Sequence, residues 1–292
     1  MMKYLLQKDN LILNINLIPM KKIFFTLLIT TIVIIIKAQE NPMIIIDSSG
    51  TGKSFTENMT EMISPLDKKQ ITTGILSDKS FIFSSMDEFN GLTDDIPIIT
   101  LERWKQIYRQ LYNGLITQEL LPSIDNIKAI ADNYLIQDIV PLAIMNIKYN
   151  EIKQYALDSN LLRFSNGKLY DVNGKNQSPY VEERLFSITL LKNEIYHGRV
   201  DFKIDNNLLI SNTTDTISSI EIDFDDGAGF VDVYENVNKR NNLTVNYSTT
   251  GIKIMTVKII FSNNIILQAK SKFTIASISS ISPDDLILVS GY

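Results

Sequence analysis

From about residue 160 to residue 276 the sequence is a series of short segments in which apolar and polar residues alternate, separated by turn residues. Alternation with a period of two places the apolar side chains on one face of a β-strand, so these segments predict strands with one buried face. The expected strands cover residues 168–172, 184–191, 198–204, 208–211, 220–224, 245–247, 254–260 and 265–275. Strands of this kind bury their apolar faces when two sheets pack together, so we expect an antiparallel β-sandwich.

An earlier region predicts helices, because its apolar residues recur at spacings of three and four. The expected helices cover residues 100–115, 123–134 and 148–158. Thr100 is placed as the N-cap of the first helix, and Gly114 lies near its end. Pro122 and Pro141 fall between the helices, where a helix is expected to break.

Three aromatic residues, Trp104, Tyr108 and Tyr112, form a stripe on the first expected helix. The stripe is either a platform for a ligand or part of a core. A spacing of four residues puts the rings on one face of the helix, and such a face typically packs against the protein interior. We therefore expect a core and no cofactor here.

Residues Met20–Gln39 have the organisation of a secretory signal peptide. Two lysines follow Met20, the apolar run Ile23–Ile36 comes next, and Ala38 marks a small-residue boundary. The run is about 14 residues long, within the roughly 7–15 residues of a signal and below the about 20 needed to span a membrane. We expect a secreted or cell-surface protein with no permanent membrane span after cleavage, and either Met1 or Met20 as the initiator.

The composition excludes several classes of function. The formal net charge is -5, so the chain lacks the basic surface that nucleic-acid binding requires. Cysteine is absent, which excludes disulfides, thiolate metal sites and thiol nucleophiles. The one histidine, His197, has no Gly-x-Ser-x-Gly elbow to accompany it, so we interpret it as structural or exposed. An enzyme is the less favoured interpretation.

One motif resembles a nucleotide-binding loop. Gly50–Ser54 reads Gly-Thr-Gly-Lys-Ser and follows the apolar run Ile44–Ile46, as in a P-loop. However, Asp47 stands where the loop requires its first glycine, and a carboxylate there repels phosphate oxygens. The nearby run Phe81–Phe83 is a weak strand and a poor second nucleotide motif. We keep a P-loop nucleotide binder only as a remote alternative.

Asp223, Asp225 and Asp226, with Asp232 nearby, form an acidic cluster. Carboxylate oxygens are the ligands that calcium prefers, so these residues are a candidate weak calcium site. The favoured interpretation is a tight turn between strands, because Asp and Gly are typical turn residues and the spacing lacks the pattern of a dedicated calcium loop. No other cofactor is expected.

The same region resembles the polycystic-kidney-disease (PKD) domain. The family pattern is a Trp-Asp-Phe-Gly-Asp-Gly strand and turn, a later apolar-x-Tyr, a Gly-Thr-Tyr turn and an alternating strand. The matching segments here are Ile220–Gly227, Val245–Tyr247, Gly251–Lys253 and Ile254–Ile259. This sequence has Ile222 in place of the tryptophan and Asp225 in place of the first glycine. The resemblance implies an immunoglobulin-like β-sandwich that serves extracellular proteins as a spacer, adhesion or polymer-contact module.

These observations predict an α+β chain in four parts. They are residues 1–39 with the signal, a mixed, partly helical domain over 40–204, a PKD-like antiparallel Ig-like sandwich over 205–277, and the start of a further segment or a tail over 278–292. The arrangement looks like the front of long exported proteins of Bacteroidetes. We expect a non-catalytic interaction or spacer protein, with an extracellular protein or polysaccharide as partner. The alternative is the N-terminal accessory part of a larger secreted hydrolase.

Overall fold

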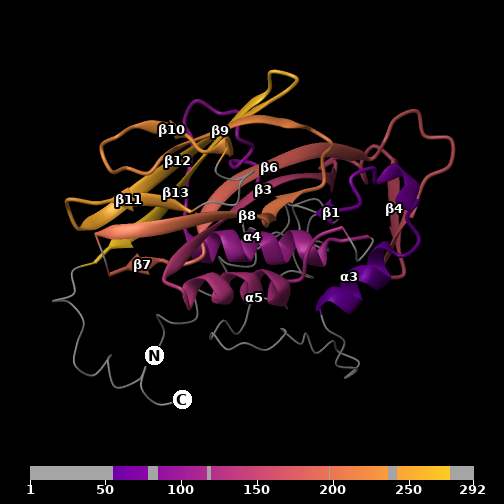
Figure 1. Ribbon diagram of the computed structural model, residues 1–292. Coiled ribbons are helices and arrows are strands. Elements are labelled where there is room, and N and C mark those ends of the chain that lie inside the picture. The colour runs from indigo at the N-terminus through magenta and orange to yellow at the C-terminus, as the bar shows by residue number, and fades with distance from the viewer. Residues whose placement is uncertain (1–54, 78–84, 117–119, 197, 236–241, 277–292) are drawn as a thin grey trace, which may run out of the picture. The chain divides into compact units, whose positions relative to one another are not determined.

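The computed structural model describes residues 55–77, 85–116, 120–196, 198–235 and 242–276 (Figure 1). Contacts between residues divide the chain into two units, Met1–Ser64 and Pro65–Tyr292. The first unit contains helix α3 (Phe55–Ile63). Every other element belongs to the second unit, which begins with a short 3-10 helix, η2 (Lys68–Gln70).

The first sheet of the second unit is organised around its longest strand, β3 (Ile139–Ile152). Strand β6 (Tyr180–Leu190) runs antiparallel along one side of β3. On the other side, β8 (Arg199–Ser211) runs parallel to the first half of β3, and β1 (Leu76–Ser77) runs parallel to its end. Strand β11 (Leu243–Asn246) then pairs antiparallel with β8.

The second sheet is built mainly from antiparallel neighbours. In spatial order these are β10 (Phe230–Asp232), β9 (Ile217–Asp223), β12 (Gly251–Phe261) and β13 (Ile266–Ile275). Two short strands, β2 (Ile98–Ile99) and β7 (Glu194–Ile195), run parallel to β13 on its other side. A separate hairpin joins β4 (Leu162–Ser165) to β5 (Lys168–Asp171).

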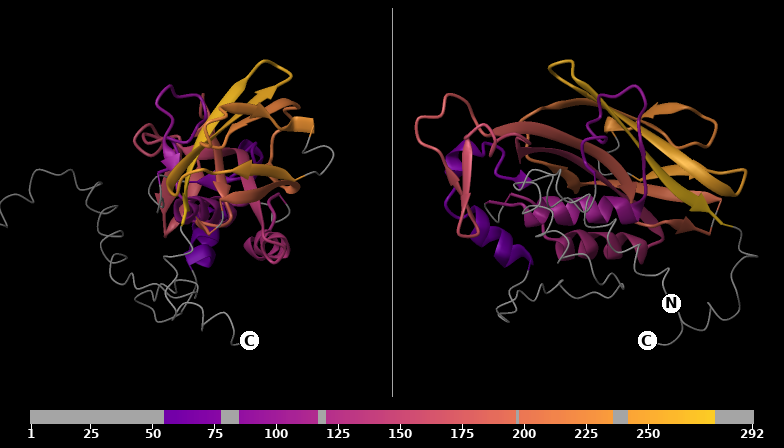
Figure 2. Two further views of the ribbon diagram at one scale, coloured as in Figure 1. Left: turned by 60° about the vertical axis from the view of Figure 1, so that its left-hand side comes forward. Right: turned by 180° about the vertical axis from the view of Figure 1, so that it is seen from behind.

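The second unit has three layers, with the first sheet in the middle (Figure 2). Helices α4 (Leu101–Asn113) and α5 (Ile124–Leu135) cover one face of the first sheet, and the second sheet packs against the other. Alternate residues of β3 supply the two cores: Ile144 points into the core between the sheets, whereas Met145 points into the core beneath the helices. This is the two-face burial that a strand with a period of two allows.

Both helices begin where the sequence predicts. The Thr100 hydroxyl accepts a hydrogen bond from the Arg103 N–H at the start of α4, and the Ser123 hydroxyl accepts one from the Asn126 N–H at the start of α5. Gly114 follows the last turn of α4. The predicted helices at 100–115 and 123–134 are confirmed.

The third predicted helix, over 148–158, is wrong. Residues 148–152 are the end of β3 and residues 154–158 are turn. Strand β3 is buried over nearly its whole length because helices cover one face and a sheet covers the other. A strand buried on both faces loses the alternation that marks an ordinary strand, so its apolar residues also fit a helical spacing. Pro141 lies within β3, opposite Lys203 of β8.

Two predicted strands, 198–204 and 208–211, are one strand, β8, interrupted by a bulge. Leu142 of β3 lies opposite Ile204, but Ile144 lies opposite Leu209, so the four residues between Ile204 and Leu209 bulge out of the ladder. The boundary expected between residues 204 and 205 falls inside this strand. The core between the sheets contains residues from both sides of that boundary.

Just after the end of β8, the Asn212 side-chain amide bonds to the backbone of β3 as a neighbouring strand would. Ser211 is the last residue of β8 that pairs with β3, and β1 begins pairing only at Asn150. Between them the Asn212 Oδ1 accepts a hydrogen bond from the Lys148 N–H at 2.8 Å, and its Nδ2 donates to the Lys148 carbonyl at 2.7 Å and to the Thr73 carbonyl at 3.2 Å. The buried edge of β3 therefore keeps its backbone partners.

Candidate functional site

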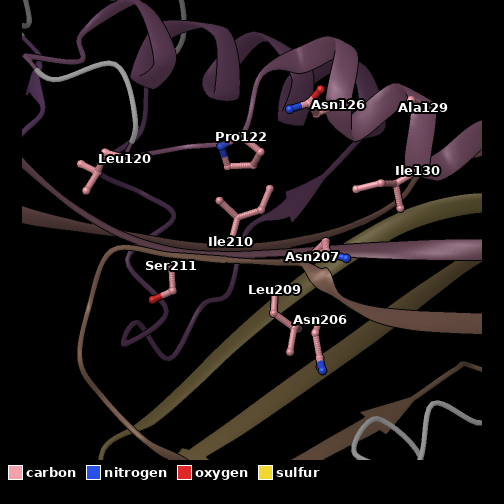
Figure 3. Close-up of a pocket in the computed structure, with 10 residues that line it drawn as sticks. All are labelled: Leu120, Pro122, Asn126, Ala129, Ile130, Asn206, Asn207, Leu209, Ile210 and Ser211. Atoms are coloured by element: carbon pink, nitrogen blue, oxygen red, sulfur yellow. The ribbon is translucent and has the colours of Figure 1, made fainter.

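A groove of about 510 Å³ lies between helix α5 and strand β8 (Figure 3). Its volume is within the roughly 300–1,000 Å³ typical of ligand sites. The residues that line it are Leu120, Pro122, Asn126, Ala129, Ile130, Asn206, Asn207, Leu209, Ile210 and Ser211. Asn126, Ala129 and Ile130 lie three and four residues apart on α5, so one stripe of that helix faces the groove.

The other wall of the groove is the edge of β8. Leu209 packs partly against the core between the sheets, whereas Ile210 belongs to the core beneath the helices. Figure 3 accordingly shows their side chains leaving the strand on opposite sides. A groove lined by consecutive strand residues from both faces of a sheet must run along the strand edge.

A hydrogen-bonded contact fixes the bulge of β8 to α5. Tyr134 donates its hydroxyl to Asp205 Oδ2 at 2.6 Å, and the Asn207 N–H donates to Asp205 Oδ1 at 2.8 Å. Burial opposes ionisation of Asp205, but the hydrogen bonds from Tyr134 and Asn207 outweigh it and lower the pKa of this carboxyl below its usual value. Asp205 is therefore a charged anchor beside the groove and not part of its lining.

The groove is uncharged and rich in hydrogen-bonding groups. None of its ten lining residues carries a charge or an aromatic ring. Within the part of the chain that the structure describes, the side-chain amides of Asn126 and Asn206 have no hydrogen-bond partner, and both residues are exposed. Each amide is both a donor and an acceptor, so the groove offers paired hydrogen bonds above an apolar floor.

The acidic cluster predicted from the sequence forms the turn after β9. Its carboxylates accept hydrogen bonds from backbone N–H groups: Asp223 from Asp225 at 2.9 Å, Asp226 from Ala228 at 3.1 Å, and Asp225 from Ile254 at 2.9 Å. Asp225 has a φ of 58°, a left-handed conformation that Asp tolerates better than most residues. These contacts are those of a turn tied to β12.

Asp232 likewise accepts a hydrogen bond from the Tyr234 N–H at 2.9 Å. Over the described ranges, no three acidic or histidine side chains are grouped in a way that suits a metal ion. The weak calcium site at Asp223, Asp225 and Asp226, which the sequence offers as the alternative to a turn, stays a prediction.

A buried tyrosine supports this turn from below. Tyr247 donates its hydroxyl to the Phe224 carbonyl at 2.9 Å. Burial, together with the charges of the neighbouring aspartates, raises the pKa of Tyr247, so the hydroxyl remains a donor at neutral pH. Phe224 in turn stacks on Phe202 of β8 with ring centroids 5.0 Å apart, which joins the turn to the core between the sheets.

The remaining sequence candidates have different outcomes. The aromatic stripe is core as predicted, because Trp104 and Tyr108 are 2% and 1% exposed. His197, the loop Gly50–Ser54 and the signal Met20–Gln39 lie outside the described residues. So do residues 278–292 and the weak strand Phe81–Phe83.

Sequence reasoning missed the groove, because its two walls are far apart in the chain and carry no motif. Asn206 and Asn207 fall between the two expected strands 198–204 and 208–211. The signal available in the sequence was the polar group Asp205–Asn207 inserted between two apolar segments that otherwise continue one another.

No protein-family model and no curated protein matches the sequence. Among the helices in the described residues, none is both long and apolar enough to cross a membrane.

Proposed function

We propose that this chain is an exported, non-catalytic protein of the cell surface or the medium, and that its β-sandwich is an interaction or spacer module. The observation that carries the proposal is the strand order of the two packed sheets. In an Ig-like sandwich one sheet has strands G, F and C as neighbours, with C′ added in some types, and the other has B beside E. The order β13, β12, β9, β10 and the pair β8 with β11 fit that scheme.

The position of the PKD-like motif within these strands supports the same proposal. The Asp-rich segment Ile220–Gly227 contains the second half of β9 and its turn, Val245–Tyr247 contains the end of β11 and the residue after it, and Gly251–Ile259 lies in β12. These are the positions of strands C, E and F in the scheme above. The resemblance over 205–277 and the strand order therefore support an Ig-like module of PKD type.

The contacts of the polar groups favour a binding role over catalysis. General acid–base catalysis needs a titratable group beside the substrate. The groove is lined by amides, one hydroxyl and apolar side chains, and the Asp205 carboxylate beside it already accepts hydrogen bonds from Tyr134 and Asn207. The carboxylates of the acidic turn bond to backbone N–H groups of the protein. We infer that the groove between α5 and β8 is the surface that contacts an extracellular partner.

Export is tested by following the chain in its source cells. We expect a protein that begins after Ala38 or Gln39, identified by intact mass, in the medium or on the cell surface. Ile29→Asp should trap the uncleaved precursor, because a charge in the apolar region costs about 2.5–3.5 kcal/mol on insertion scales. Ile29→Val is the matched control and should be processed normally. Uncleaved native chain in the cytoplasm would contradict the proposal.

A further inference from the structure

The edge of β8 that faces the groove has no strand beside it among the described residues. Strand β11 pairs with β8 only from Arg199 to Phe202, and β3 occupies the opposite side from Asp201 to Ser211. From the bulge onward, no described residue pairs with the backbone of β8 on its β11 side, which faces the groove. An open strand edge presents backbone N–H and C=O groups that are ready to pair with another chain.

Helix α5 turns this open edge into a bounded slot. The stripe Asn126, Ala129 and Ile130 faces the same space as Asn206 to Ser211 of β8. The bond between Tyr134 and Asp205 holds the helix and the strand together at one end. Extended peptides add a strand at an exposed sheet edge, and pockets beside that edge take their alternate side chains.

Resting on the proposed function as an interaction protein, we propose that this groove binds an extended, uncharged polypeptide segment as an added strand on β8. The backbone of the segment pairs with Leu209–Ser211. Alternate side chains of the segment lie against Ala129 and Ile130 of α5, where Ile130 is partly buried and Ala129 leaves room. The free amides of Asn126 and Asn206 add hydrogen bonds at the rim.

The chemistry of the lining selects this class of ligand. The ten lining residues include no cation for an acidic ligand and no carboxylate for a basic one, and the Asp205 carboxylate beside them is already bonded to Tyr134 and Asn207. It also has no aromatic ring to stack on the face of a sugar. An uncharged peptide backbone satisfies an open strand edge, which needs donors and acceptors in alternation at the spacing of a β-strand.

The size of the groove favours a segment of another protein over a second copy of this chain. If a second copy paired its β8 edge here, its own α5 would have to enter the groove as well. A helix with its side chains is about 10–12 Å wide, which is too large for a space of about 510 Å³ that must also hold a strand. An isolated extended segment carries no such flanking element.

The test begins with selection of uncharged octapeptides from a bead library by the full chain. Peptides that also bind Ala129→Trp are discarded, because this substitution at an exposed position fills the groove. The affinity of a selected peptide for the chain is then measured by fluorescence anisotropy. Ala129→Trp should weaken its affinity at least about tenfold, as loss of a central contact typically does. Alternate N-methylation of the peptide backbone should weaken it similarly, because it removes the strand hydrogen bonds. Lys128→Trp, on the same helix and outside the groove, should leave affinity unchanged.

Three results would overturn the proposal. They are a selection that enriches no peptide over the counter-selection, an N-methylated peptide that binds as tightly as the parent, or a loss of affinity in Lys128→Trp equal to that in Ala129→Trp.

Sedimentation of the peptide-free chain tests whether a second copy occupies the groove. A dimer that Ala129→Trp dissociates would assign the groove to a second copy. A chain that is exported and retained at the surface but enriches no peptide refutes the strand-addition proposal alone. A chain that is not exported refutes the proposed function, whatever the peptide result.

Discussion

The turn after β9 and the groove beside α5 are both rich in short polar side chains. In the turn these side chains bond to the protein's own backbone, whereas in the groove two of them have no partner in the described part of the chain. In the turn, Asp223, Asp225 and Asp226 each accept a backbone N–H of the protein itself. In the groove, the side-chain amides of Asn126 and Asn206 have no partner among the described residues. The difference teaches that a concentration of polar residues identifies a binding surface only where their hydrogen bonds are still available.

The largest expected effect removes the support beneath the turn. Phe224 is 3% exposed and stacks on Phe202, so Phe224→Ala should lower the free energy of unfolding by about 3–5 kcal/mol. Urea unfolding followed by circular dichroism measures the change. Phe230→Ala is the matched control, because Phe230 is 48% exposed on edge strand β10 and its loss should cost less than about 0.5 kcal/mol. If the two variants lose equal free energy of unfolding, the claim that Phe224 joins the turn to the core is wrong.

A smaller effect tests whether the carboxylates of the turn are structural. Asp225→Ala should cost about 1–2 kcal/mol, because it removes the acceptor for the Ile254 N–H and places alanine in a left-handed conformation. Asp225→Asn keeps an acceptor oxygen and tolerates that conformation, so it should cost less. Thermal unfolding in EDTA and in calcium gives the decisive comparison. If calcium raises the melting temperature of the native chain but not of Asp225→Asn, the turn is a metal site.

The smallest effect concerns the anchor between the helix and the strand beside the groove. Tyr134→Phe removes the hydrogen bond to Asp205 and should cost about 1 kcal/mol at pH 7, reduced by partial solvent screening. The bond stabilises the charged carboxylate and lowers its pKa, so its contribution is present above the ordinary value of 3.8 and is lost as the pH falls through the lowered pKa. Urea unfolding should therefore show a smaller difference between native and variant near pH 3. A difference that grows on acidification would contradict this assignment.

The sequence could predict the elements whose pattern is set locally. Strands such as β9 and β12 have one buried face, so their residues alternate, and both helices carry their capping residues in the sequence. Strand β3 could not be recognised, because burial of both its faces removed the alternation. The turn was recognised from its Asp and Gly residues.

The groove was out of reach for a different reason. The groove exists because α5 lies beside β8 and because the pairing between β11 and β8 stops at Phe202. Both are features of the tertiary structure. None of the groove's lining residues is of a type that indicates a catalytic or metal-binding function from sequence alone. Only the bulge at Asp205–Asn207 left a trace in the sequence, and that trace is also typical of an ordinary turn.

Amide hydrogen exchange of the peptide-free chain, measured residue by residue by NMR, tests the central contrast most directly. The account predicts slow exchange at the Ile254 amide, which donates to Asp225. It predicts fast exchange at alternate amides over Leu208–Ser211, on the side of β8 away from β3. Uniformly slow exchange along that stretch of β8 would show that the edge is already paired. It would contradict the assignment of this groove as an available binding surface.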